Sequence, residues 1–173
     1  MRTLYLLRHA KSSWDDPGLD DHDRPLSARG RRAAALMGAH LREEGVRPDL
    51  VLCSSARRAR ETYERVAAGL GGEEPPPVRF ERGLYLAASD RLLEHLRAAP
   101  DEAQAVLLIG HNDGLPQLAL HLAGAAEGEA RKSLAAKFPT AALAVLTFDL
   151  PSWRNLAEGS GRLAAVVMSK QLV

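Results

Sequence analysis

Two arginines and two histidines stand where three apolar runs of this 173-residue chain end. Arg8 and His9 directly follow one run, Arg58 comes shortly after a second, and His111 comes after a third. Guanidinium groups bind phosphate oxygens, and a neutral imidazole can act as a nucleophile. We therefore predict an anion site in which Arg8 holds a phosphoryl group and His9 attacks it.

Helical spacing separates Arg58 from the arginines around it. Arg57 can pair with Glu61 four positions later, because such residues share one face of a helix. Arg60 can pair with Glu64 in the same way. Arg58 has no acidic residue at this spacing and would lie in the first turn, where an unpaired guanidinium favours an external anion. The alternative is an ordinary surface arginine, since most arginines are exposed.

A metal site is the alternative for the two histidines. Neutral imidazole is a common metal ligand, and Asp113 lies close to His111 in the sequence. A third ligand with a matching spacing is missing, so we expect no metal. Three other histidines lie within helical patterns and are expected at the surface or the edge of the core: His40, His95 and His121.

The elements that must position these residues alternate between strands and helices. The apolar patterns predict strands near residues 3–8, 50–53, 78–81, 105–109, 142–148 and 162–168. Helices are predicted from Ser27 to about residue 44, from Ser54 or Ser55 to about residue 70, and over 89–97 and 115–122. This alternation predicts an α/β fold, a three-layer α/β/α sandwich with a mostly parallel central sheet. The carboxyl ends of its parallel strands would bring the three segments together.

Composition restricts the partners and the compartment. The chain is 46% hydrophobic and 26% charged, with a formal net charge of +1, and its length suits a single domain over residues 1–173. This charge gives no basic field for nucleic acid, and no apolar run approaches the ~18 residues of a membrane span. Cys53 is the sole cysteine, which excludes an intramolecular disulfide. The first residues lack a signal-peptide pattern, so we expect a cytoplasmic protein.

Four motifs resemble those of a known family. Residues 8–14 read Arg-His-Ala-Lys-Ser-Ser-Trp, residues 24–30 read Arg-Pro-Leu-Ser-Ala-Arg-Gly, and two further motifs span residues 54–62 and 110–112. In type and order they are similar to the motifs of the histidine phosphatase superfamily, which includes the cofactor-dependent phosphoglycerate mutases. The Arg-His-Ala-Lys-Ser variant most resembles the phosphohistidine phosphatase (SixA-like) branch. The resemblance implies a phosphoglycerate mutase-like fold.

The same resemblance implies a reaction and its residues. His9 would attack phosphorus and become a phosphohistidine, while Arg8, Arg58 and His111 would bind the phosphoryl oxygens without a metal or other cofactor. His9 must be neutral to attack, whereas His111 serves best as a hydrogen-bond donor. The substrate implied is a phosphohistidine-containing protein. The chain departs from many relatives at Ala10, where they have glycine, and at Asp15, where they have asparagine.

The proton donor leaves the substrate class open. Relatives that act on phosphate esters carry an acidic residue after the third strand, and Glu81 is the nearest candidate. Its neighbours Arg79 and Arg82 favour a surface ion pair instead. If Glu81 is the acid, the alternative is a small-molecule phosphomonoesterase or mutase. A phosphate-dependent binding module without turnover is the alternative that is not an enzyme.

Residues 11–26 are polar and predict a long loop at the rim of the site. Lys11, Arg24 and Arg29 would add positive charge there, and Trp14 could wall the pocket or anchor the loop. Aspartates make the same loop acidic, at positions 15, 16, 20, 21 and 23. Residues 137–140 resemble a SixA-like segment, and we assign them no chemistry.

Overall fold

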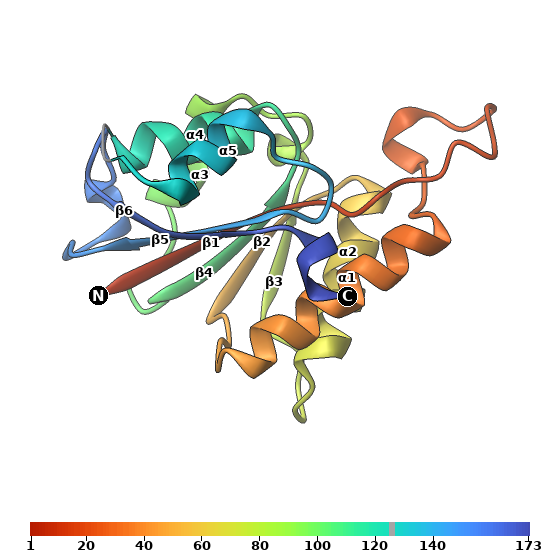
Figure 1. Cartoon of the computed structure of the whole chain (residues 1–173), viewed down its shortest axis with the longest axis horizontal. Coiled ribbons are helices and arrows are strands. Elements are labelled where there is room, and N and C mark those ends of the chain that lie inside the picture. Colours follow the sequence, from red (N-terminus) through yellow and green to blue (C-terminus); the bar gives the residue numbers. More distant parts are fainter. Residues whose placement is uncertain (125–126) are drawn as a thin grey trace.

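The computed structural model describes residues 1–124 and 127–173 and contains a six-stranded sheet with helices on both faces (Figure 1). The strands are β1 (Arg2–Arg8), β2 (Leu50–Ser54), β3 (Val78–Glu81), β4 (Ala105–Gly110), β5 (Leu143–Phe148) and β6 (Arg162–Val167). Their order is β3-β2-β4-β1-β5-β6, and β5 runs antiparallel to its neighbours β1 and β6 while the other pairs are parallel. The predicted α/β fold with a mostly parallel sheet is confirmed.

Strands β1 and β4 lie side by side although they are far apart in the sequence. Their parallel register runs from Thr3 opposite Ala105 to Arg8 opposite Gly110. The ladder continues one residue further, because the His9 amide donates to the Gly110 carbonyl oxygen at 3.0 Å. The two histidine segments therefore leave the sheet at the same edge, next to each other.

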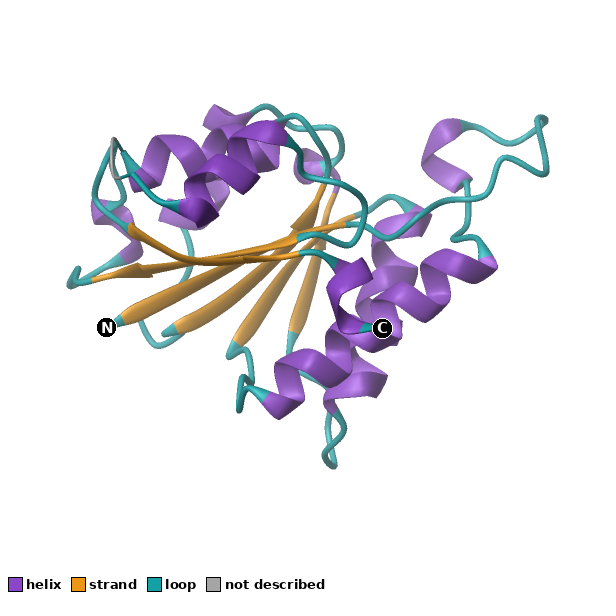
Figure 2. Cartoon of the chain, in the orientation of Figure 1, coloured by secondary structure: helices purple, strands orange, loops and turns teal. Residues whose placement is uncertain are grey.

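Alternating side chains of the strands build a separate core on each face of the sheet, beneath the helices that Figure 2 shows on both faces. Leu4 and Leu6 of β1 join the core under α3 (Ser89–Arg97), α4 (Gly114–Ala123) and α5 (Glu129–Ala136). Leu7 joins the opposite core under α1 (Ala28–Glu43) and α2 (Arg57–Leu70). The chain after β1 therefore turns to one face and the chain after β4 to the other. Such a switch between adjacent strands creates a crevice where ligands of open α/β sheets bind.

The predicted start of α1 is confirmed, and that of α2 is wrong in detail. Ser27 is the N-cap of α1, and its hydroxyl accepts from the Gly30 amide at 3.1 Å. Helix α2 has Ala56 as its N-cap, with no side-chain capping bond. The Ser54 hydroxyl lies 2.8 Å from His111 Nε2, and the Ser55 hydroxyl lies 2.8 Å from His22 Nε2. Helix α5 and four short 3-10 helices were not predicted: η1 (Asp21–Asp23), η2 (Arg82–Leu84), η3 (Trp153–Asn155) and η4 (Ser169–Leu172).

The loop after β1 projects beyond the strand ends and returns to α1 (Figure 1). An isolated antiparallel bridge between Ser12 and Leu26 closes its base, and η1 lies within it. The Lys11 carbonyl oxygen accepts from the Ser27 amide at 2.9 Å, which holds the loop against the start of α1. No helix within residues 1–124 and 127–173 combines the length and apolar character that crossing a membrane requires.

Candidate active site

A cavity of about 600 Å³ opens where β1 and β4 end, and it brings together four of the predicted site residues. Arg8, His9, Arg58 and His111 all line it, whereas Glu81 does not. The further lining residues come from the loop after β1, from the turns after η2 and β4, and from the segment before β5: Lys11, Ser12, Trp14, Arg24, Leu86, Asn112, Lys137, Phe138, Pro139 and Thr140.

His9 has its two ring nitrogens in different surroundings. Nδ1 lies 2.7 Å from the Ala10 carbonyl oxygen, which can only accept, so Nδ1 carries the proton. Nε2 accepts a long contact of 3.4 Å from Arg58 Nε. Burial and the nearby arginines lower the pKa of His9 to about 4, and its exposed fraction is 6%. The ring is therefore neutral near pH 7, with its lone pair on Nε2 beside a cationic side chain.

His111 faces His9, with ring centroids 5.2 Å apart. Its Nε2 lies 2.8 Å from the Ser54 hydroxyl, whose oxygen accepts from the Ala56 amide at 3.2 Å. Nδ1 of His111 is buried and has no partner in the described part of the chain. Burial, together with His9 and Arg58, lowers the pKa of His111 to about 3. His111 is therefore neutral here and retains one nitrogen for a ligand.

Arg58 is buried, but the prediction that it lacks an acidic partner is wrong. Its Nη2 donates to Asp21 Oδ2 at 3.0 Å, and its Nη1 donates to the Asp21 carbonyl oxygen at 2.7 Å. The i+4 rule considers only partners on the same helix, whereas this aspartate lies on the loop after β1. The predicted Arg57–Glu61 pair forms at 3.1 Å.

The other predicted ion pairs near the site do not form. Arg60 lies over the Phe80 ring, with its guanidinium carbon 4.4 Å from the centroid, rather than against Glu64. Glu81 makes no ion pair with Arg79 or Arg82 within residues 1–124 and 127–173. Its backbone contacts the turn between β2 and α2, where its carbonyl oxygen accepts from the Ser55 amide at 3.3 Å.

Arg8 is tied to the segment before β5, to which we assigned no chemistry from the sequence. Its Nη1 donates to the Phe138 carbonyl oxygen at 3.2 Å, and Asn112 Nδ2 donates to the same oxygen at 2.7 Å. Nε of Arg8 is buried without a partner among the described residues. Arg8 and Asn112, which both donate to this carbonyl oxygen, line the cavity, and we did not predict this contact from the sequence.

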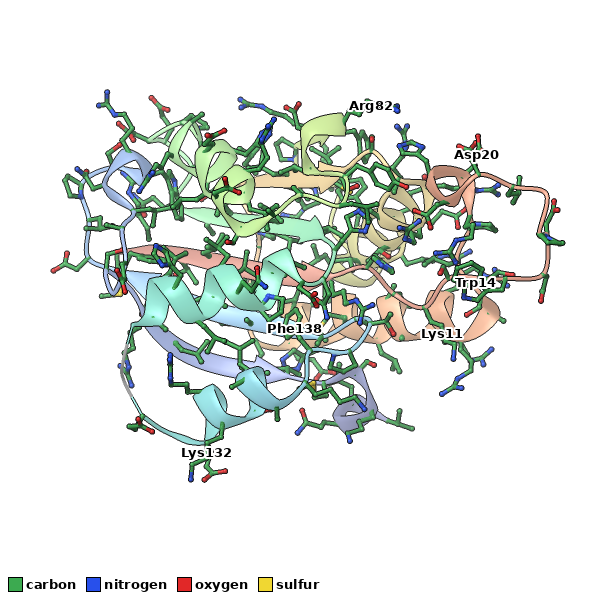
Figure 3. The ribbon with its side chains drawn as sticks, turned by 90° about the horizontal axis from the view of Figure 1, so that it is seen from above. Lys11, Trp14, Asp20, Arg82, Lys132 and Phe138 are labelled. Atoms are coloured by element: carbon green, nitrogen blue, oxygen red, sulfur yellow. The ribbon has the colours of Figure 1, made fainter. Side chains whose placement is uncertain are left out.

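The rim of the cavity combines positive charge with an exposed aromatic ring. Lys11 and Trp14 lie near each other on the projecting loop, with Asp20 farther along it (Figure 3). Trp14 is 75% exposed, and the Arg24 guanidinium lies 3.6 Å from its ring centroid. Asp15 is exposed and does not line the cavity. Among the residues that the structure describes, no group of three His, Cys, Asp or Glu side chains is placed to hold a metal ion.

Comparison with known proteins agrees with this geometry. The model of the histidine phosphatase superfamily (branch 1) matches residues 4–85. An uncharacterised protein of Mycobacterium tuberculosis is 38% identical over 159 residues, which cover 91% of this chain and 96% of the relative. Two solved structures provisionally named phosphohistidine phosphatase SixA are also similar. The one from Nakamurella multipartitia is 32% identical, with a TM-score of 0.84 over 96% of this chain and 95% of that chain.

The second, from Agrobacterium tumefaciens, is 30% identical, with a TM-score of 0.79 over 96% of this chain and 97% of that chain. These similarities extend over nearly the whole chain, well beyond the residues that the family model matches. The chain therefore belongs to the histidine phosphatase superfamily and is a phosphatase.

Proposed function

We propose that the chain, acting as a single domain over residues 1–173, hydrolyses phosphohistidine on a protein substrate through a phosphorylated His9. The observation that carries this proposal is the placement of His9 Nε2. It is the unprotonated nitrogen, it lies 3.4 Å from Arg58 Nε, and it stands in a cavity that Arg8 and His111 also line. Phosphoryl transfer depends mainly on positioning and on charge stabilisation, which these groups supply without a metal.

The first half-reaction transfers the phosphoryl group to His9. The lone pair on Nε2 attacks phosphorus, the bond between phosphorus and the leaving nitrogen breaks, and the leaving imidazole keeps that electron pair. A substrate imidazole protonated on its other nitrogen leaves as a neutral ring and needs no separate acid. Arg8 and Arg58 stabilise the negative oxygens during transfer. In this mechanism the Ser54 hydroxyl, 2.8 Å from His111 Nε2, donates to that nitrogen, so that His111 carries its proton on Nδ1 and donates it to a phosphoryl oxygen.

The second half-reaction returns the enzyme to its starting state. Because the Ala10 carbonyl oxygen holds the proton on Nδ1, the phosphorylated His9 ring is cationic. Water attacks phosphorus, the bond between Nε2 and phosphorus breaks, and His9 leaves as the neutral imidazole. The water proton departs with the inorganic phosphate or with solvent. The hydrogen bond to Ala10 therefore makes the intermediate labile.

The alternative, a phosphomonoesterase or mutase, requires an acid because an alkoxide is a poor leaving group. Glu81 was the candidate from the sequence, and its absence from the cavity lining argues against that role. The proposed substrate needs no such acid, and none of the described residues that line the cavity is an aspartate or a glutamate.

Hydrolysis of a phosphohistidine protein and of a panel of phosphate monoesters tests the proposal. We expect the wild type to prefer phosphohistidine, His9→Ala to lose at least about a thousandfold in kcat/KM, and Glu81→Gln to change it less than about threefold. His121→Ala, at an exposed histidine, is the control and should match the wild type. Turnover that survives in His9→Ala would contradict the nucleophile. A wild type that hydrolyses only monoesters, with activity lost in Glu81→Gln, would establish the alternative.

A further inference from the structure

The Asp21 carboxylate is bonded to side chains from three parts of the chain. Its Oδ2 accepts from Arg58 Nη2 at 3.0 Å and from the Tyr85 hydroxyl. Its Oδ1 accepts from Arg24 Nε at 3.2 Å and from Arg24 Nη2 at 3.1 Å. These partners lie on α2, next to η2 and at the end of η1. Nothing in the proposed reaction assigns this aspartate a role.

The Asp21 contacts occupy one particular part of the Arg58 guanidinium. Nη1 and Nη2, which form the end of the fork, donate to the Asp21 carbonyl oxygen and carboxylate. The N–H of Nε and the second hydrogen of Nη2 together form the side edge of the planar group. The N–H of Nε points to His9 Nε2. The end of the fork is thus satisfied within the protein, and the side edge faces the reacting nitrogen.

We propose that Asp21 is a positioning residue, which orients the side edge of Arg58 toward a phosphoryl group at His9. The inference rests on the proposed function only in taking Arg58 as a ligand of the phosphoryl oxygens. Asp21 itself does not touch the reacting atoms. A long arginine side chain loses much rotamer freedom on binding, and a partner that already holds its fork reduces that loss.

The surroundings of Asp21 favour positioning over two other roles. The hydrogen bond from Tyr85, together with Arg58 and Arg24, holds the pKa of Asp21 well below its usual range, so it has no proton to donate near pH 7. A carboxylate that competed with phosphate would have to leave Arg58 when substrate binds. Tyr85 and Arg24 hold it in place independently of Arg58, and it takes the end of the fork that phosphate does not need.

Inorganic phosphate binding, followed by phosphorus NMR, and kcat/KM with phosphohistidine protein test this role in matched variants. Asp21→Asn removes the charge but keeps the size, and we expect it to weaken phosphate binding and lower kcat/KM, each about tenfold. Asp20→Asn makes the same charge change at an exposed neighbour and should stay within about twofold of the wild type. Equal losses in both variants would overturn the proposal, because they would show an effect of charge alone.

Dependence on Arg58 separates positioning from general packing. In an Arg58→Ala background, Asp21→Asn should cause no further loss of phosphate affinity. The same tenfold loss in that background, or tighter phosphate binding in Asp21→Asn alone, overturns the proposal. Tyr85→Phe removes one donor to the carboxylate and should weaken phosphate binding about threefold.

If Asp21→Asn does not fold, unchanged phosphate binding in Tyr85→Phe overturns the proposal. Phosphate binding does not depend on turnover. A wild type that binds phosphate but leaves phosphohistidine intact therefore contradicts the proposed substrate, while the comparison of the Asp21 variants still decides the positioning role.

Discussion

The Ser54 side chain connects the backbone at the start of α2 to the second histidine of the site. Its hydroxyl oxygen accepts from the Ala56 amide and lies 2.8 Å from His111 Nε2, to which it donates in the proposed mechanism. Ser54 is fully buried, so water does not replace either bond easily. A single hydroxyl thus contacts both the backbone at the start of α2 and a ring nitrogen of His111.

We expect Ser54→Ala to lower kcat/KM about tenfold, because His111 loses the donor that keeps the proton on Nδ1 and a buried nitrogen is left unpaired. Steady-state kinetics with phosphohistidine protein measures this loss. Ser55→Ala is the matched control, since the Ser55 hydroxyl bonds to His22 outside the cavity lining. Wild-type activity in Ser54→Ala would show that the tautomer of His111 does not depend on this bond.

The site residues differ in how far sequence reasoning could reach them. Arg8, His9 and His111 follow apolar strands closely, so a strand pattern and the rule for parallel sheets suffice to bring them together. The contact between Arg58 and Asp21 joins a helix to a loop 37 residues away, and no local spacing encodes it. Nothing in the sequence distinguishes Asp21 from Asp20, because only the path of the loop selects one of them.

At the level of elements, helix α1 and the loop after β1 meet at a glycine. A Cβ atom at Gly30 would lie 2.1 Å from the Lys11 carbonyl oxygen, which is backbone and cannot rotate away. Lys11 follows Ala10, whose carbonyl oxygen binds His9 Nδ1. The first turn of α1 therefore determines the position of the Lys11 backbone. It thereby also affects the position of the neighbouring Ala10 carbonyl oxygen, which binds His9.

Gly30→Ala should destabilise the protein by about 1–3 kcal/mol and lower activity, because either the helix or the Lys11 backbone must shift. Urea unfolding and kcat/KM measure the two effects. Gly18→Ala is the control in the same loop, where the nearest atom to a Cβ is the Asp16 carboxylate oxygen at 3.3 Å on a flexible side chain. If Gly30→Ala is as stable and active as Gly18→Ala, the close approach does not position the site.

Elements with strong apolar patterns were predicted well, and those with weak patterns were not. Five of the six strands and α1 to α4 follow from runs or stripes of leucine, valine and alanine, whereas β3 (VRFE) was predicted from the alternation of Val78 and Phe80 with charged residues. Helix α5 contains one buried residue, Leu134, in a polar stretch, so its sequence carries no stripe. The cap of α2 was misplaced because serines before a helix usually cap it, whereas the buried Ser54 hydroxyl is turned toward His111.

For the whole molecule, the two buried histidines link stability to pH. Their folded-state pKa values, about 4 for His9 and about 3 for His111, lie below the ordinary 6.5. At pH values between the folded-state pKa and 6.5, each histidine binds a proton in the unfolded chain but not in the folded one. The free energy of unfolding therefore decreases as the pH falls below 6.5. Going from pH 7 to pH 5 should cost about 2 kcal/mol for each histidine.

Urea unfolding at pH 7 and pH 5 measures this dependence. In His9→Ala, the difference in unfolding free energy between the two pH values should shrink by about 2 kcal/mol, since one titrating group is gone. His121→Ala removes an exposed histidine and should keep the full difference. Equal pH dependence in the wild type and His9→Ala would mean that His9 titrates alike in the folded and unfolded chains.

The strand order has a consequence for when the site comes into existence. Strand β4 lies between β1 and β2, so β1, β2 and β3, which precede β4 in the chain, cannot form one continuous sheet among themselves. A nascent chain that ends before Ala105 has His9 but neither the neighbouring strand nor the Gly110 carbonyl that receives the His9 amide. Contacts of such long sequence separation form late in folding. The proposed nucleophile, His9, therefore precedes in the chain the strand that completes its surroundings, and the site we propose can form only after β4 has been translated.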